Sequence, residues 1–328
     1  MENFKYKLSV IIPMYNAEKY IANCLDSILN SDLPKECYEV AIINDGSKDK
    51  GPEIAQEYVS RHSNFIYLNQ KNQGQSMARN YGIREAQGEY IWCVDADDKL
   101  DSVSLVSVYE ELNSHLGLDI LAFQLKQVTE NGVFVSVECS QPQVKHNSEI
   151  KGREAIIQGY CPSSVCALIV RKQMLIENEL FFKEGITQQD VELSYRLFAH
   201  AKNVYFSDIA PYIYIHHPNS TSKPTDVKKI IKYQCDKVEI IKSFRRLSLD
   251  YINTDIELAD TILNFADDAL FGCVYGLFQN RKKWKPLGVN QAALNKLKEE
   301  DLYPLKLPFT SWKKWMVCKL LNIRWLIA

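Results

Sequence analysis

The sequence lacks the features that would place it outside the ordinary globular proteins. Its 328 residues include only 13 glycines and 11 prolines, and neither residue gathers into a long linker or a repeat of fixed period. This composition, with 46% hydrophobic and 24% charged residues, excludes disordered, collagen-like and repeat-dominated chains. A chain of this length can bury one large core or two of ordinary size.

Long apolar runs and paired cysteines are missing as well. No 18 consecutive apolar residues occur, so the sequence predicts no helix that spans a bilayer. The nine cysteines contain no CxxC pair, which argues against a disulfide framework or a zinc site and favours a reduced, cytoplasmic protein. The apolar run at residues 8–12 is short and lacks a cleavage-site pattern, so we interpret it as a strand rather than a signal peptide.

The small net charge of −2 hides two oppositely charged parts. Residues 281–328 contain 11 lysines and arginines against three acids, a net charge of +8, and residues 1–280 therefore carry −10. Bulk charge gives no reason to expect nucleic-acid binding. It does predict that the C-terminal part presents a different surface from the rest.

The N-terminal part alternates between strand and helix patterns. Short apolar runs at residues 8–12, 38–43, 65–68 and 90–94 are separated by segments of helical period. This predicts an α/β fold with a Rossmann-like, mostly parallel central sheet and flanking helices. In such sheets, ligands bind beyond the carboxyl ends of the strands.

The alternation loosens after residue 100. We expect strands at residues 119–126, 133–137 and 165–170, and an amphipathic helix at 189–201. Helical periodicity dominates from residue 226 onward. The expected domains are therefore residues 1–222, the α/β part, and 223–328, a helical region with a basic, tryptophan-rich end.

Polar side chains follow each of the first four predicted strands. Together they offer an aromatic ring and a carboxylate for a base, an arginine for phosphate, and clustered acids for a divalent cation. Each also has a structural interpretation, as a turn residue, an exposed loop aromatic or a helix cap. The residues are Pro13, Tyr15, Asn16, Asp45, Arg79, Asp95, Asp97 and Asp98.

The order of these clusters resembles family 2 glycosyltransferases. The resemblance is carried by LSVIIPMYNAEKY, IINDGSKD, NQGQSMARN and VDADD, covers residues 6–115 in detail and continues more weakly to about residue 222. It implies a GT-A fold that binds a nucleotide sugar and transfers the sugar with inversion. The helical C-terminal region lies outside the resemblance.

The resemblance also implies roles for individual residues. The segment with Pro13, Tyr15, Asn16 and Glu18 would hold the base and ribose together with Asp45. Arg79 would approach the diphosphate. Asp95 and Asp97 would bind the donor, and the metal, Mg or Mn, would be held by Asp97, Asp98 and His216. A structural alternative for His216 and His217 is a pair of partly exposed histidines at a strand end.

Inverting transfer needs a general base for the acceptor hydroxyl. Asp190 stands where the family usually has Glu-Asp at the start of a helix, and we expect it to be this base. Gln189 replaces the commoner glutamate, which leaves acceptor identity open. A helix N-terminal carboxylate is the structural alternative for Asp190.

The C-terminal end interleaves cations with tryptophan. Residues 281–285 read RKKWK, residues 312–315 read WKKW, and residues 311–328 contain no acid. This pattern suits the surface of an anionic bilayer, because tryptophan prefers the headgroup region and cations attract anionic lipid. Packing of the tail on the body is the alternative. Nucleic acid is not an expected partner, because no binding module accompanies the cations.

These inferences combine into one expected function with rivals. The sequence predicts an inverting glycosyltransferase, in the cytoplasm or peripheral on the inner face of the plasma membrane. It would pass a hexose or N-acetylhexosamine from UDP to a glycan or polyprenyl-linked glycan during envelope polysaccharide synthesis. The alternatives are a catalytically reduced nucleotide-sugar-binding subunit, a sugar nucleotidyltransferase, and a membrane-interaction protein.

Overall fold

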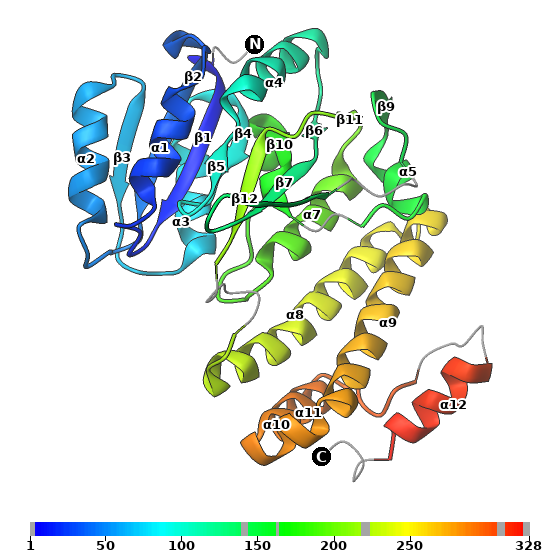
Figure 1. The fold of residues 1–328 in the computed structure, drawn as a ribbon. Coiled ribbons are helices and arrows are strands. Elements are labelled where there is room, and N and C mark those ends of the chain that lie inside the picture. The colour runs from blue at the N-terminus through cyan, green and yellow to red at the C-terminus, as the bar shows by residue number, and fades with distance from the viewer. Residues whose placement is uncertain (1–3, 139–143, 162–163, 218–223, 307–311, 324–328) are drawn as a thin grey trace. The chain divides into compact units, whose positions relative to one another are not determined.

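The computed structural model describes residues 4–138, 144–161, 164–217, 224–306 and 312–323 (Figure 1). The chain divides into two compact units. One comprises residues 1–185 and 189–218, and the other comprises residues 186–188 and 219–328.

The N-terminal unit is built on a central sheet of eight strands in the order β3-β2-β1-β4-β10-β6-β11-β9 (Figure 1). Its first four strands in the chain are parallel neighbours, and β10 runs antiparallel between β4 and β6. The expected α/β fold is therefore confirmed. The strands are β1 (Tyr6–Met14), β2 (Tyr38–Asn44), β3 (Phe65–Asn69), β4 (Gly88–Cys93), β6 (Ile120–Ala122), β9 (Ser148–Ile150), β10 (Leu168–Arg171) and β11 (Val204–Phe206).

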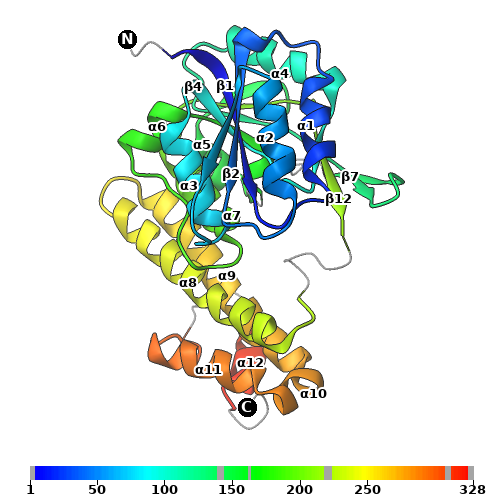
Figure 2. The same ribbon diagram turned by 90° about the vertical axis from the view of Figure 1, so that its left-hand side faces the viewer.

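Helices cover both faces of this sheet, as Figure 2 shows with the sheet edge-on. On one face, Val10 and Ile12 of β1 belong to a buried cluster that includes residues of α1, α2 and α4. On the other face, α3 packs so closely that a Cβ at Gly82 would lie 2.5 Å from Ile11 Cγ2. The helices are α1 (Ile21–Leu29), α2 (Gly51–Arg61), α3 (Gln75–Glu85), α4 (Ser102–Ser114), α5 (Gly152–Ile157), α6 (Lys172–Glu177) and α7 (Gln189–His200).

A second, four-stranded sheet has the order β5-β12-β7-β8. It consists of β5 (Lys99–Leu100), β7 (Leu125–Thr129), β8 (Phe134–Glu138) and β12 (Tyr212–His216). The strand expected at residues 119–126 is therefore wrong as a single element, because β6 and β7 join different sheets. Between them the Gln124 amide donates to the Ile209 carbonyl (3.0 Å), which turns the chain away from the central sheet.

The strand expected at residues 165–170 begins later than predicted. Val165–Ala167 forms the short 3-10 turn η2, and the Ser164 hydroxyl accepts from the Cys166 amide (3.2 Å) at its start. Only the following residues pair in β10. A second such turn, η1 (Lys35–Cys37), precedes β2.

The C-terminal unit is helical, as expected. It contains α8 (Val227–Tyr251), α9 (Ile256–Gln279), α10 (Arg281–Trp284), η3 (Lys285–Leu287), α11 (Val289–Glu299) and α12 (Trp312–Leu321). Asp226 caps α8 by accepting from the Lys229 amide (3.0 Å). One stripe of α9 is buried, and its residues are Leu258, Ala259, Ile262, Ala266, Leu270, Cys273, Val274 and Leu277.

Two further features complete this unit. The Asp236 carboxylate accepts from the amide (2.7 Å) and hydroxyl (3.0 Å) of Thr187. Thr187 lies two residues before the start of α7. Helix α12 packs Cys318 and Leu321 into the helical core. None of the helices in the described ranges is both long and apolar enough to cross a membrane.

Candidate functional site

The polar clusters meet at one edge of the central sheet because four neighbouring strands end there. Met14 of β1 pairs with Asn44 of β2, and Asn44 pairs with Asn69 of β3. Strand β4 runs parallel to β1 and ends just before the acidic cluster. The loops that leave these strands therefore face the same region.

Asp45 fastens the loop that leads into α3. Its carboxylate is 3% exposed and accepts from Gln70 Nε2 (2.7 Å) and from the amides of Gln73 and Gly74 (both 2.8 Å). Gly74 has φ of +91°, a conformation that glycine adopts without steric cost. Asp45 thus shapes the loop before α3, and little of its acceptor capacity remains for a ligand.

The segment after β1 is tied to the loop after β2. Asn16 Oδ1 accepts from the Lys48 amide (2.8 Å), and Glu18 Oε2 accepts from the Lys50 amide (3.1 Å). Pro13 is buried within β1, whereas Tyr15 is 50% exposed. Tyr15, Asn16 and Glu18 are all exposed, and the side chains of Asn16 and Glu18 hold the loops together.

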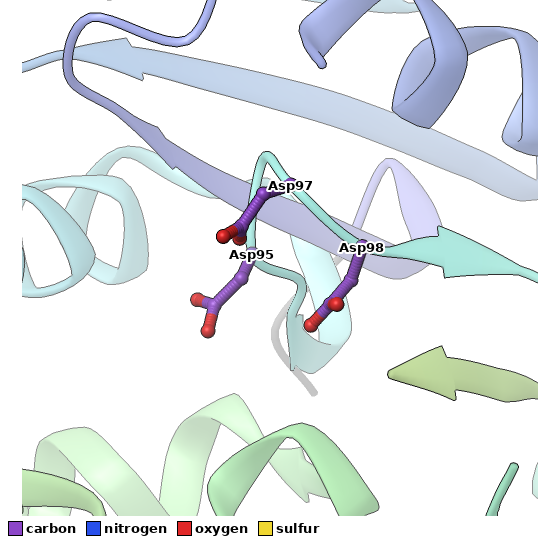
Figure 3. A group of neighbouring side chains, drawn as sticks. All are labelled: Asp95, Asp97 and Asp98. Atoms are coloured by element: carbon purple, nitrogen blue, oxygen red, sulfur yellow. The ribbon is translucent and has the colours of Figure 1, made fainter. Parts of the chain in front are cut away.

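The three acids after β4 form one cluster. Ligand atoms of Asp95, Asp97 and Asp98 lie within 4.8 Å of one another, and Figure 3 shows all three side chains projecting from the same loop. Partial removal from water, followed by repulsion from Asp95, raises the pKa of Asp97. Such crowding of like charges favours a bound cation.

Asp98 differs from the other two acids. It is 3% exposed, and its two oxygens accept from the Tyr212 hydroxyl (2.5 Å) and the Ile215 amide (2.8 Å). Burial, together with Asp95 and Asp97, raises the pKa of Asp98 to about 8. Asp98 stays a predicted metal ligand as a member of the acidic cluster, and its oxygens also hold β12 beside the acidic loop.

Asp97 and Asp95 fit a hard divalent cation better. The Asp97 side chain is 50% exposed. Tyr212 and Ile215 donate to Asp98 and not to Asp97. Asp95 Oδ1 accepts from two donors of α3, Gln75 and Arg79. Carboxylate oxygens of this kind suit Mg or Mn.

Arg79 is a buried cation at the floor of the site. It is 2% exposed, donates from Nη2 to Asp95 Oδ1 (2.5 Å), and lies 5.1 Å from the Phe182 ring centre. Burial alone would lower the pKa of Arg79, but Asp95 and the neighbouring groups raise it above its ordinary value. The guanidinium is thus fixed in its charged form beside the acidic loop.

Helix α7 brings Asp190 to the same place. Gln189 at its start donates from Nε2 to Gln75 Oε1 (3.1 Å), and Gln75 Nε2 donates to Asp95 Oδ1 (3.0 Å). Removal from water raises the pKa of Asp190, while the charge of Arg79 opposes this rise. Asp190 is therefore near enough to Arg79 and Asp95 for their charges to shift its pKa.

The histidine nearest the acids is His217, not the predicted His216. His216 Nε2 lies 2.9 Å from Gln127 Oε1. His217 Nε2 lies 3.3 Å from the Asp97 carbonyl oxygen and 4.0 Å from its carboxylate, and the His217 ring packs on Tyr20. His216 is the last residue of β12 and His217 follows it, and the sequence gives no sign of which one faces the acids.

Sequence reasoning also missed Gln75 and Tyr212. Both are ordinary residues for a helix start and a buried strand. Only the contacts across the sheet edge, from Gln75 to Asp95 and from Tyr212 to Asp98, reveal their place in the site.

Comparisons with known proteins point to one family. The sequence model of Glycosyl transferase family 2 matches residues 9–161. EpsJ of Bacillus subtilis, named an uncharacterized glycosyltransferase, is 31% identical over 223 residues, which is 66% of this chain and 63% of EpsJ. GgaB of the same organism, named a minor teichoic acid biosynthesis protein, is 35% identical over 126 residues, 38% of this chain and 14% of GgaB. The chain thus spans less than two thirds of these curated relatives.

Solved structures show the same fold. The crystal structure of Staphylococcus aureus TarS 1–349 in complex with UDP-GlcNAc matches with a TM-score of 0.68 at 23% sequence identity. The match covers 97% of this chain and 88% of that one. It supports the GT-A arrangement that the sequence predicts.

Proposed function

We propose that the chain belongs to glycosyl transferase family 2, whose sequence model matches residues 9–161, and that it is an inverting glycosyltransferase with a nucleotide-sugar donor. One observation carries this proposal. A buried arginine, an accessible acidic cluster and a separate carboxylate at a helix start, namely Arg79, Asp95 with Asp97, and Asp190, meet at one edge of the sheet.

The donor is a UDP-sugar, a UDP-hexose or UDP-N-acetylhexosamine. The structure of TarS in complex with UDP-GlcNAc supports this choice of nucleotide. Tyr15, exposed beyond β1, would stack on the base, and the loops tied by Asn16, Glu18 and Asp45 would enclose it with the ribose. Arg79 and Asp95 would lie under the diphosphate.

A divalent cation, Mg or Mn, would be held by Asp95 and Asp97. When bound, it neutralises charge on the diphosphate leaving group. The residues of the chain do the rest: Arg79 adds a fixed positive charge, and His217 closes one side of Asp97. Asp98 keeps β12, and with it His217, beside the acids.

Asp190 acts as the general base. It takes the proton of the acceptor hydroxyl as that oxygen forms a bond to the anomeric carbon. The bond between this carbon and the diphosphate oxygen breaks on the opposite side, and the nucleoside diphosphate leaves with the electron pair. A base with a raised pKa is better matched to this task near neutral pH than an ordinary aspartate.

The acceptor is a glycan or polyprenyl-linked glycan of the bacterial envelope. The naming of GgaB for teichoic acid biosynthesis supports this class of acceptor. We further propose that the protein works at the inner face of the plasma membrane and contacts it through α12. This helix presents Trp315, Met316 and Leu320 outward, each about half exposed, with Lys319 among them.

UDP release tests the proposal. The purified protein is assayed with a panel of UDP-sugars and envelope glycans, with Mn²⁺ or with a chelator. Asp190→Asn should lower transfer by about 100-fold or more, because general-base catalysis typically contributes that much. UDP binding, followed by thermal shift, should remain. The matched control is Asp260→Asn, at an exposed position on α9.

Two outcomes would contradict the proposal. Full transfer by Asp190→Asn would remove the residue from the reaction. If UDP-sugars stabilise the protein but neither transfer nor hydrolysis occurs, the alternative of a catalytically reduced nucleotide-sugar-binding subunit is favoured.

A further inference from the structure

Two glutamine side chains form a bridge across the candidate site. Gln75 is the first residue of α3 and Gln189 is the first residue of α7, and they are 114 positions apart in the sequence. Gln189 Nε2 donates to Gln75 Oε1 (3.1 Å), and Gln75 Nε2 donates to Asp95 Oδ1 (3.0 Å). The bridge therefore links the start of the helix that carries Asp190 to the acid paired with Arg79.

The direction of this bridge is fixed by its acidic end. Asp95 accepts hydrogen bonds when ionised, so Gln75 must turn its NH2 group toward it. The Gln75 oxygen then faces Gln189, which must offer a donor. A side chain at position 189 that can only accept hydrogen bonds would place its oxygen against the Gln75 oxygen. The hydrogen bond between the two side chains would then be lost.

This direction explains the departure from the family pattern at Gln189. A glutamate carboxylate at position 189 would meet the Gln75 oxygen. If Gln75 turned over to offer its NH2 group to such a glutamate, its oxygen would face Asp95 instead. Gln189 thus supplies the donor that the Gln75 oxygen requires.

We propose that Gln75 and Gln189 are a matched pair of positioning residues, resting on the proposed glycosyltransferase function. By holding one oxygen of Asp95, the pair directs the other toward the donor. By bracing the start of α7, it sets the distance from Asp190 to the acidic cluster. The identity required at position 189 therefore depends on the residue at position 75.

A double-mutant cycle tests this dependence. Gln189→Glu is made in the native chain and in a Gln75→Ala chain, and kcat and KM for transfer are measured in all four proteins. In the native chain, Gln189→Glu should lower kcat/KM by about tenfold or more, chiefly through kcat. In the Gln75→Ala chain, the same change should cost about twofold or less, because the opposing oxygen is absent. Gln56→Glu, at an exposed position on α2, controls for the added charge.

The alternative is that residue 189 touches the acceptor independently of Gln75. Gln189→Glu would then have the same effect in both chains, mainly on the KM of the acceptor, and this result would overturn the proposal. A second cycle, with Gln75→Ala and Gln189→Ala, measures unfolding midpoints in urea and needs no activity. Non-additive shifts of the unfolding midpoint would support the bridge even if no substrate is found, whereas additive shifts would contradict it. Failure of the bridge is therefore distinguishable from failure of the proposed function.

Discussion

Asp98 shows how one residue of a motif differs from its neighbours. It stands in the same run of acids as Asp95 and Asp97, yet it is buried and accepts from Tyr212 and Ile215. Its two bonds bring β12 of the second sheet against the loop after β4. The carboxylate thus has a structural task next to the proposed metal ligands.

Its pKa gives a prediction for stability. The folded-state pKa of about 8 lies above the ordinary value of 3.8, so the folded protein holds a proton that the unfolded chain releases. This contribution to the free energy of unfolding is complete below about pH 4 and is lost as the pH rises toward 8. The loss approaches on the order of 1 kcal/mol per pH unit within that window.

Asp98→Asn should remove this dependence. Urea unfolding is measured in the presence of a chelator between about pH 5 and about pH 8. The free energy of unfolding of the native protein should fall with rising pH relative to that of the variant. Asp260→Asn, on exposed α9, should follow the native protein. If the native protein and Asp98→Asn show parallel pH profiles, the carboxylate is not held protonated by the fold.

At the scale of elements, helix α7 depends on close packing against α5. The Gly152 amide donates to the Ala201 carbonyl (3.0 Å), just after the end of α7. A Cβ at Gly152 would lie 2.1 Å from the Phe198 carbonyl oxygen and 3.1 Å from Ala201 Cβ. A backbone oxygen inside a helix cannot move aside without shifting the helix.

Gly152→Ala should therefore destabilise the protein by about 1–3 kcal/mol or more, as overpacking does. Gly276→Ala is the matched control, because a Cβ there meets no atom within 4 Å inside α9. That change should stabilise the helix by about 0.5–1 kcal/mol. Urea unfolding midpoints measure both. Equal midpoints for the two variants would show that α5 and α7 separate at little cost.

At the scale of the whole molecule, charge and exposed apolar surface are unevenly distributed. Residues 281–328 carry a net charge of +8, and α10 exposes Lys282 and Lys283. Both views place α10 and α12 at the same end of the helical unit (Figures 1 and 2). Anionic lipid would attract these cations, and the outward face of α12 would enter the headgroup region.

Leu320→Asp should weaken binding to vesicles that contain anionic lipid, because it places a charge on the exposed face of α12. Leu249→Asp is the control, since Leu249 is also exposed (66%, against 53% for Leu320) but lies on α8. Vesicle flotation measures the bound fraction, and added salt should lower it. If both variants float like the native protein, or if neutral vesicles bind equally well, α12 does not make this contact.

The sequence anticipated much of the fold because strands and helices leave local patterns. The four apolar runs became β1 to β4, and the helix expected at residues 189–201 is α7. The family resemblance is confirmed by the match over residues 9–161. The boundary between β6 and β7 was missed, since the choice between two sheets depends on a contact with Ile209, far along the chain.

Local sequence patterns were enough to identify the residues at the ends of the parallel strands, because apolar strand segments and the polar residues that follow them can be recognised from neighbouring residues alone. The candidates Tyr15, Arg79, Asp97 and Asp190 follow from that order and from the family resemblance. Only the tertiary structure decided what each neighbour does: Asp98 turns to Tyr212, His217 rather than His216 faces Asp97, and Gln75 meets Gln189. These choices depend on hydrogen bonds between segments distant in the chain, whose pairing is fixed only when the strands and helices pack.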